Sequence, residues 1–240
     1  MTTMTMTTTQ AVATDVNPLA LKRTARVTGV LYLDLAITGA LSFLLIRNQL
    51  FDAGNPNSTL ANLTERSGLA RLGIAVEMGI VLTQALAAVW FYRLFRSVDS
   101  FAAGSLAAFG LVNATILSGS AAMLAAAVDV AGDTPLTAAG DSAGTAQLLY
   151  ELSGHFWGVG AIFFGLWLIP MGWLVLRSGW LPALMGRILI GGGVLYVLSA
   201  FVTYLFANGD TVAGLMTLPA TIGEVWILGY LIIHGVRERP

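Results

Sequence analysis

The sequence lacks cysteine and has few charged residues. Its 240 residues include no Cys, and only 10% are Asp, Glu, Lys or Arg. The absence of thiols excludes disulfides, thiolate metal sites, iron–sulfur clusters and cysteine nucleophiles. A soluble domain carries about 25% charged residues, so this chain cannot build a fully water-exposed surface. We therefore expect lipid to cover much of it. The formal net charge of −1 leaves no basic face for nucleic acid.

Histidine is nearly absent as well. The two histidines, His155 and His234, are expected at opposite membrane faces, about 30 Å apart, so they cannot ligate one haem together. Two histidines without cysteine also fall short of a three-histidine zinc site. The chain contains no P-loop, dinucleotide fingerprint or paired nucleophile and base. We expect no metal and no cofactor, and an enzyme is the least favoured class of function.

What the chain has instead is long apolar runs. Six runs are long enough to cross a bilayer as helices, and they cover residues 27–46, 72–92, 101–128, 156–176, 184–206 and 212–233. The sequence thus predicts an all-α, polytopic bundle of six transmembrane helices within residues 21–240. Residues 1–20 are polar and threonine-rich, without periodicity, and are expected to form a disordered cytoplasmic tail.

The basic residues indicate the orientation of the spans. Cytoplasmic loops carry an excess of Lys and Arg, and an even number of spans places nine of the 12 basic residues on one side. Those nine are Lys22, Arg23, Arg26, Arg93, Arg96, Arg177, Arg187, Arg237 and Arg239, and the other three are Arg47, Arg66 and Arg71. The pattern predicts a cell-membrane protein with both termini in the cytoplasm.

Three stretches of the chain resemble a bacterial membrane-protein family known as domain of unknown function 4386. The most specific is the middle one, with Arg177-Ser178-Gly179-Trp180-Leu181-Pro182. The first stretch consists of residues 17–19 and 26–33. The middle stretch consists of His155, 164–168, Gly172, 177–182 and Gly186. The third consists of Gly223, Glu224, 231–233 and 235–236. The resemblance covers residues 17–237 and implies a multi-pass membrane protein, but no activity. Asp34 departs from the apolar residue expected after Leu33, so a role for it would be particular to this chain.

Three acidic residues lie inside predicted spans: Asp34, Glu77 and Glu224. An ionisable group near the centre of a membrane helix costs about 2.5–3.5 kcal/mol on insertion scales. One interpretation is a buried polar site, either a proton path or a pocket for a small ligand. The other is that each acid is neutral or hydrogen-bonded to a neighbouring helix. The available partners are Tyr32, Thr83, Gln84, Asn113, Thr115, Tyr196 and Tyr204.

Arg71 and His155 are candidates near the outer ends of their spans. Arg71 is expected to reach the outer surface or to pair with Glu65, Glu151 or a lipid phosphate, and it could also point into an outer cavity beside His155. For His155 the alternatives are an interfacial hydrogen bond and a contact to a ligand or proton in that cavity.

Two hypotheses of function follow. In the first, the protein binds or transports a small molecule, lipid or proton in a cavity between the second, fourth and sixth spans, contacted by Arg71, Glu77, His155 and Glu224. In the second, it is a non-catalytic membrane subunit or sensor whose buried polar residues only specify helix packing. An intramembrane enzyme ranks third. The bilayer is the one partner that the sequence implies, and a homo-oligomer stays open.

The orientation gives the first testable prediction. Reporter fusions at Asn55 and Gly140 should report the outer side, and a fusion at the C-terminus should report the cytoplasm, because the charge bias sets the insertion of short loops. A C-terminal reporter that is active only outside the cytoplasm would contradict the six-span topology.

Overall fold

The structure, a computed structural model, describes residues 18–132 and 140–237. Its helices are α1 (Pro18–Ala40), η1 (Leu41–Arg47), α2 (Asn48–Leu50), α3 (Pro56–Glu65), α4 (Ser67–Phe95), α5 (Ser100–Ala131), α6 (Ser142–Ser178), α7 (Ala183–Leu205) and α8 (Gly209–Ile233). Helices α1, η1 and α2 run on as one span, and the described residues contain six helices long and apolar enough to cross a membrane. This confirms the prediction of an all-α bundle with six spans.

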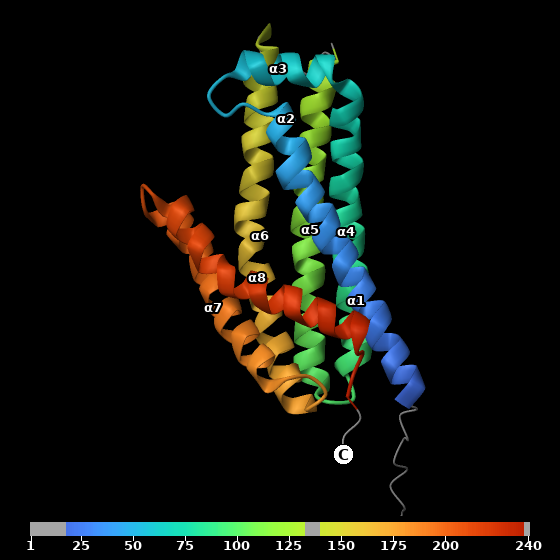
Figure 1. Cartoon of the computed structure of the whole chain (residues 1–240). Coiled ribbons are helices and arrows are strands. Elements are labelled where there is room, and N and C mark those ends of the chain that lie inside the picture. Colours follow the sequence, from blue (N-terminus) through green and yellow to red (C-terminus); the bar gives the residue numbers. More distant parts are fainter. Residues whose placement is uncertain (1–17, 133–139, 238–240) are drawn as a thin grey trace, which may run out of the picture.

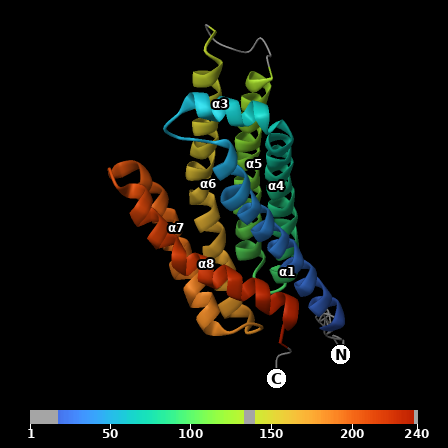
Figure 2. The ribbon, with the colours of Figure 1, turned by 45° about the horizontal axis from the view of Figure 1, so that its top comes forward.

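The spanning helices pack as a closed ring. Each helix contacts the next in the order α1, α4, α5, α6, α7 and α8, and α8 returns to α1. Helices α4, α5 and α6 stand side by side, whereas the α7–α8 hairpin leans across them at a steep angle (Figures 1 and 2). Helix α1 begins and α8 ends at the same end of the bundle. This closure leaves space for a site at the centre of the ring.

The start of the first helix differs from the expected one. Helix α1 begins at Pro18, so residues 18–20 are helical and not part of the tail, and the rest of the predicted tail lies outside the described residues. The connection after the first span contains α3, which lies across the end of the bundle (Figure 1). Asn55 caps this helix by accepting a hydrogen bond from the Ser58 N–H, and Pro56 fills its first turn.

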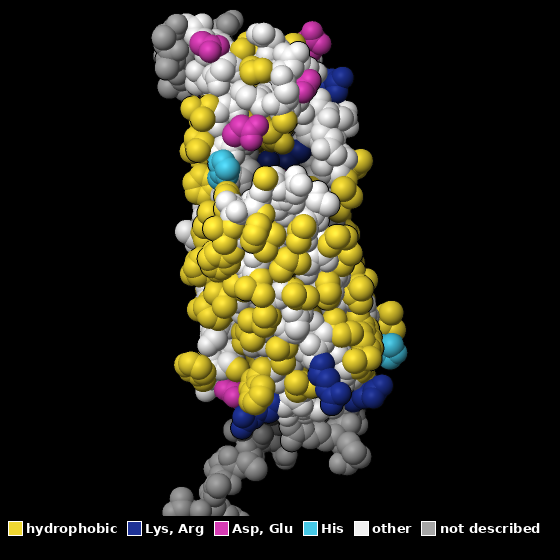
Figure 3. All heavy atoms as spheres, turned by 90° about the vertical axis from the view of Figure 1, so that its left-hand side faces the viewer, with side chains coloured by type: hydrophobic (Ala, Val, Ile, Leu, Met, Phe, Trp, Pro, Cys, Tyr) yellow, Lys and Arg dark blue, Asp and Glu magenta, His cyan; other side chains and the backbone are white. Residues whose placement is uncertain are grey.

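The surface charges match the pattern read from the sequence. Figure 3 shows a broad belt of hydrophobic side chains with Lys and Arg gathered mainly at one end and acidic side chains mainly near the other. The basic end is the one where α1 begins. The belt fits a protein embedded in a bilayer; which end faces the cytoplasm stays a prediction.

Helices α6 and α7 meet along a seam of glycines. A Cβ atom placed on Gly172 would lie 2.5 Å from the Gly186 carbonyl oxygen, and one on Gly165 would lie 2.7 Å from that of Gly193. The two glycines of each helix are seven residues apart, so both lie on the same face. The backbones therefore approach more closely than any side chain would allow.

Two other pairs of small residues, Gly154 with Gly158 and Gly104 with Ala108, do not form such a seam. A Cβ on Gly154 or Gly104 would meet no atom within 4 Å, and one on Gly158 would meet the Tyr204 side chain. Those positions do not bring helix backbones together.

The seam generates the second prediction. Gly172→Leu should lower the free energy of unfolding by about 1–3 kcal/mol or more, because the new side chain collides with backbone that cannot move aside. Gly191→Leu on α7 is the matched control, since a Cβ there meets nothing within 4 Å. The measurement is thermal unfolding of the detergent-purified proteins, and equal melting temperatures for the two variants would refute the seam.

Candidate functional site

A cavity of about 370 Å³ lies at the centre of the helix ring. Every spanning helix contributes to its wall: Tyr32, Leu35, Ala36, Gly39 and Ala40 from α1, Ile80 and Gln84 from α4, Asn113 and Leu117 from α5, Trp157 and Phe164 from α6, Tyr196 from α7, and Thr217, Thr221, Glu224, Val225 and Leu228 from α8. Thr221 is 12 residues from each end of α8, about 18 Å at 1.5 Å per residue. The cavity therefore lies near the middle of the membrane.

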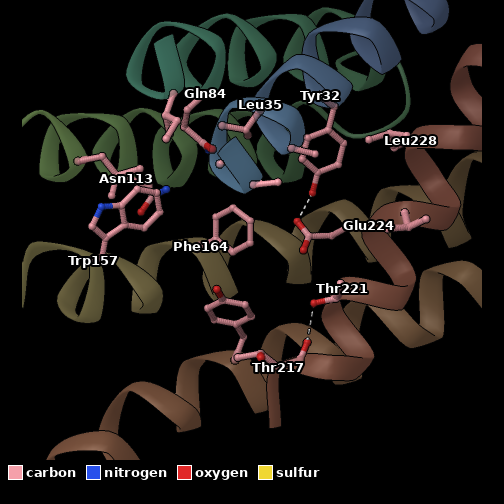
Figure 4. Close-up of a pocket in the computed structure, with 17 residues that line it drawn as sticks. Tyr32, Leu35, Gln84, Asn113, Trp157, Phe164, Thr217, Thr221, Glu224 and Leu228 are labelled. Carbon is pink, nitrogen blue, oxygen red and sulfur yellow. Dashed lines mark hydrogen bonds between the residues drawn. The ribbon is translucent and has the colours of Figure 1, made fainter. Parts of the chain in front are cut away.

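Glu224 reaches the cavity from α8. The Tyr32 hydroxyl on α1 donates a hydrogen bond to Oε1 of Glu224, and the Tyr32 ring is held edge-on against Phe91 and Trp167, with centroids 5.4 and 5.7 Å away. Oε2 of Glu224 has no hydrogen bond among the described residues. Half of the carboxylate thus remains available to a ligand (Figure 4).

Gln84 approaches the cavity from the opposite side. Its side chain is 0% exposed, yet neither its amide nitrogen nor its amide oxygen has a partner among the described residues. The indole N–H of Trp157, which also lines the cavity, is unpaired as well. Figure 4 shows Gln84, Asn113 and Trp157 on one side of the space and Glu224 and Thr221 on the other. Unpaired buried polar groups cost about 1–3 kcal/mol each, so a polar partner at this wall would be stabilising.

The cavity opens sideways between α1 and α8. Ala36 and Ala40 of α1 and Thr221 and Val225 of α8 line it and are also exposed on the outside of the bundle. Val225, for example, is 63% exposed. These residues lie at mid-span, within the hydrophobic belt, so the opening faces the hydrocarbon of the bilayer.

A second polar cluster lies nearer the end of the bundle where α3 lies, around Arg47 and Glu77. Their side chains are 6% and 1% exposed, and Arg47 Nη2 lies 2.9 Å from Glu77 Oε1. Arg47 Nε donates to the same oxygen at 3.1 Å, as does the Ser42 hydroxyl at 2.9 Å. Ser120 accepts from Arg47 Nη2 at 3.0 Å and donates to Glu77 Oε2 at 3.2 Å. Ser153 accepts from Nη1 at 3.2 Å. Each of these polar groups has a partner inside the protein.

The π-helical segment η1 explains how one helix supplies both Ser42 and Arg47. Residues five apart point about 140° apart on an α-helix, at 100° per residue. The wider π turn closes hydrogen bonds between residues five apart, which brings both side chains to the same carboxylate. The first span was expected to end at Ile46, with Arg47 among the charges outside it. This expectation was wrong, because the helix continues to Leu50.

The Arg47 cluster is closed. The guanidinium also lies over the rings of Phe43 and Tyr150, with its carbon 5.1 and 5.7 Å from their centroids. The space next to the cluster measures only about 10 Å³, which is about the limit for one water molecule. The pair therefore ties η1, α4, α5 and α6 together and leaves no room for a ligand.

The comparison with known proteins agrees with this architecture. A family described as Domain of unknown function (DUF4386) matches residues 27–235, most of the chain. The chain belongs to this family. No curated protein and no solved structure matches it. The match shows which family the chain is in and leaves its activity to be argued from the site.

In this DUF4386 member, the residues singled out from the sequence do not meet at one place. Glu224 lines the central cavity, whereas Glu77 belongs to the Arg47 cluster. Arg71 is exposed near the start of α4, and His155 is exposed on α6, with its Nδ1 3.2 Å from the Tyr204 hydroxyl. The expected cavity between the second, fourth and sixth spans is instead one lined by all six.

Asp34 also lies away from the cavity. It is exposed on α1, about 160° around the helix from Tyr32 at 100° per residue. Among the described residues, no group of three or more His, Cys, Asp and Glu side chains could hold a metal ion.

Sequence reasoning missed Arg47 as a buried residue and named Gln84 only as a hydrogen-bond partner. A signal for Arg47 was present, since an unpaired Glu77 in the second span requires a partner of opposite charge at similar depth. No sequence signal showed that Gln84 would be left unpaired.

The Arg47 cluster generates the third prediction. Arg47→Leu or Glu77→Leu alone should destabilise the protein by about 3–5 kcal/mol, because each leaves the other charge buried and unpaired. The double variant should be more stable than either single variant. A double-mutant cycle of thermal unfolding measures this, and purely additive losses would contradict the pairing.

Proposed function

We propose that this integral membrane protein binds a small amphiphilic molecule that enters the central cavity from the bilayer. The observation that carries the proposal is Gln84, fully buried on the cavity wall with both amide atoms unpaired among the residues that the structure describes. Buried polar groups in native proteins are nearly always hydrogen-bonded. A ligand with a polar head would supply the partners that the helices do not.

The contrast with the Arg47 cluster supports this proposal. There, the buried charges and serines are hydrogen-bonded to one another, and the structure has no space beside them for a ligand. That cluster fits the alternative hypothesis, in which polar residues specify helix packing. The central cavity does not fit it, because helix packing alone would not leave Gln84 and Trp157 unpaired next to a void.

The size and access of the cavity also favour a ligand. Small-molecule sites usually measure about 300–1,000 Å³ and combine apolar walls with a few polar groups, and the cavity measures about 370 Å³. Its sideways opening between Ala36 and Thr221 would admit a molecule dissolved in the bilayer. We place the protein in the cell membrane with both termini cytoplasmic, on the strength of the basic end of the bundle.

The fourth prediction tests binding by filling the cavity. Gly39 lines the cavity, and a Cβ atom placed on it would meet no atom within 4 Å, so Gly39→Phe should fit without collision and occupy the space. The probes are 1-adamantanol and 1-adamantylamine, which share one apolar cage. Each probe that binds the wild type should bind the variant at least about tenfold more weakly, measured by thermal shift against probe concentration.

Gly214→Phe is the control, because Gly214 is also open to a side chain but does not line the cavity. It should bind both probes like the wild type. Equal binding by Gly39→Phe and the wild type would place the probes elsewhere and contradict the proposed function.

A further inference from the structure

We infer that the ligand of the central cavity is a lipophilic organic cation, with its positively charged head against Glu224 and its apolar part toward the opening between α1 and α8. The inference rests on the proposed function and specifies its ligand. It is carried by the charge of the cavity wall, by the free carboxylate oxygen and by the aromatic rings around it.

The one Asp, Glu, Lys, Arg or His side chain in the described cavity wall is acidic. Glu224 is the one Asp or Glu among the described residues that line it, and none of those residues is Lys, Arg or His. An ionised carboxylate at mid-membrane without a basic partner is unfavourable. The protein solves this problem for Glu77 with Arg47, and its described residues offer no such partner to Glu224. A cationic ligand would supply the missing charge.

The carboxylate is oriented to receive such a head group. The hydrogen bond from Tyr32 occupies Oε1. Figure 4 shows the other oxygen facing the space between Phe164 and Thr221. An ammonium group there would make a charge-assisted hydrogen bond, the stronger kind.

Aromatic rings form another part of the cavity wall. Tyr32, Trp157, Phe164 and Tyr196 line the cavity, and the rings of Phe164 and Tyr196 lie 5.2 Å apart at 51°. The negative faces of aromatic rings attract cations, most strongly where water is excluded. The Glu224 carboxylate and these rings together favour an ammonium group. An anion would be repelled by Glu224.

The test varies the charge of the ligand at constant shape. The probes are 1-adamantylamine, 1-adamantanol and 1-adamantanecarboxylate, and the protein is held in phosphatidylcholine nanodiscs, whose zwitterionic lipid does not itself concentrate cations. The wild type should bind the amine at least about tenfold more tightly than the alcohol, and the carboxylate most weakly.

Two acid-to-amide variants test whether the preference for the amine depends on Glu224. Glu224→Gln keeps the size of the side chain and its hydrogen bonding with Tyr32, and it should reduce the preference for amine over alcohol to near one. Asp34→Asn makes the same change on the outer face of α1, away from the cavity, and should keep the wild-type preference.

The outcomes separate the two proposals. Equal binding of amine and alcohol, both abolished by Gly39→Phe, would overturn the cationic ligand and leave the proposed function standing. A preference for the amine that survives in Glu224→Gln would overturn the assignment to Glu224. Failure of all three probes to bind would overturn both proposals. The charge series on the wild type alone decides the ligand class, whatever the stability of Glu224→Gln.

Discussion

A bilayer offers no water to a polar side chain, so every such group inside a span needs a partner from the protein. The pair of Arg47 and Glu77 meets this requirement most fully. Its hydrogen bonds draw in Ser42, Ser120 and Ser153, and through them η1, α4, α5 and α6. A buried ion pair adds little net stability over apolar packing, but separating it is strongly unfavourable. The parts of these four elements around the cluster are therefore held together.

The central cavity departs from the same requirement. Among the described residues, Gln84 and Trp157 keep unpaired polar atoms, and Glu224 is bonded through one oxygen only. Trp167 Nε1 is also unpaired among the described residues, although Trp167 does not line the cavity, whereas the Arg47 cluster is hydrogen-bonded throughout. Local conflicts of this kind are expected where a structure serves a function. These different surroundings distinguish Glu224 from Glu77, which the sequence alone presents as two equivalent acids.

The six spans could be predicted because hydropathy and length suffice for helices that must cross lipid. The partners of the acids could not. Tyr32 and Glu224 are 192 residues apart, and nothing local in the sequence pairs them. Arg47 was misplaced because it follows an apolar run, and a π turn changes which residues share a face without changing composition. The glycine seam was readable in principle, since Gly165, Gly172, Gly186 and Gly193 show a seven-residue spacing in neighbouring spans.

The two polar sites tie different sets of helices together. The Arg47 cluster holds η1 to α4, α5 and α6, and its hydrogen bonds reach neither α7 nor α8 within the described part of the chain. The α7–α8 hairpin is attached along the glycine seam to α6 and through Tyr32 and Glu224 to α1. The opening of the cavity lies along that last contact. A cation bound to Glu224 would share one carboxylate with Tyr32, so on the inferred ligand class the ligand and the α1–α8 contact would depend on the same side chain.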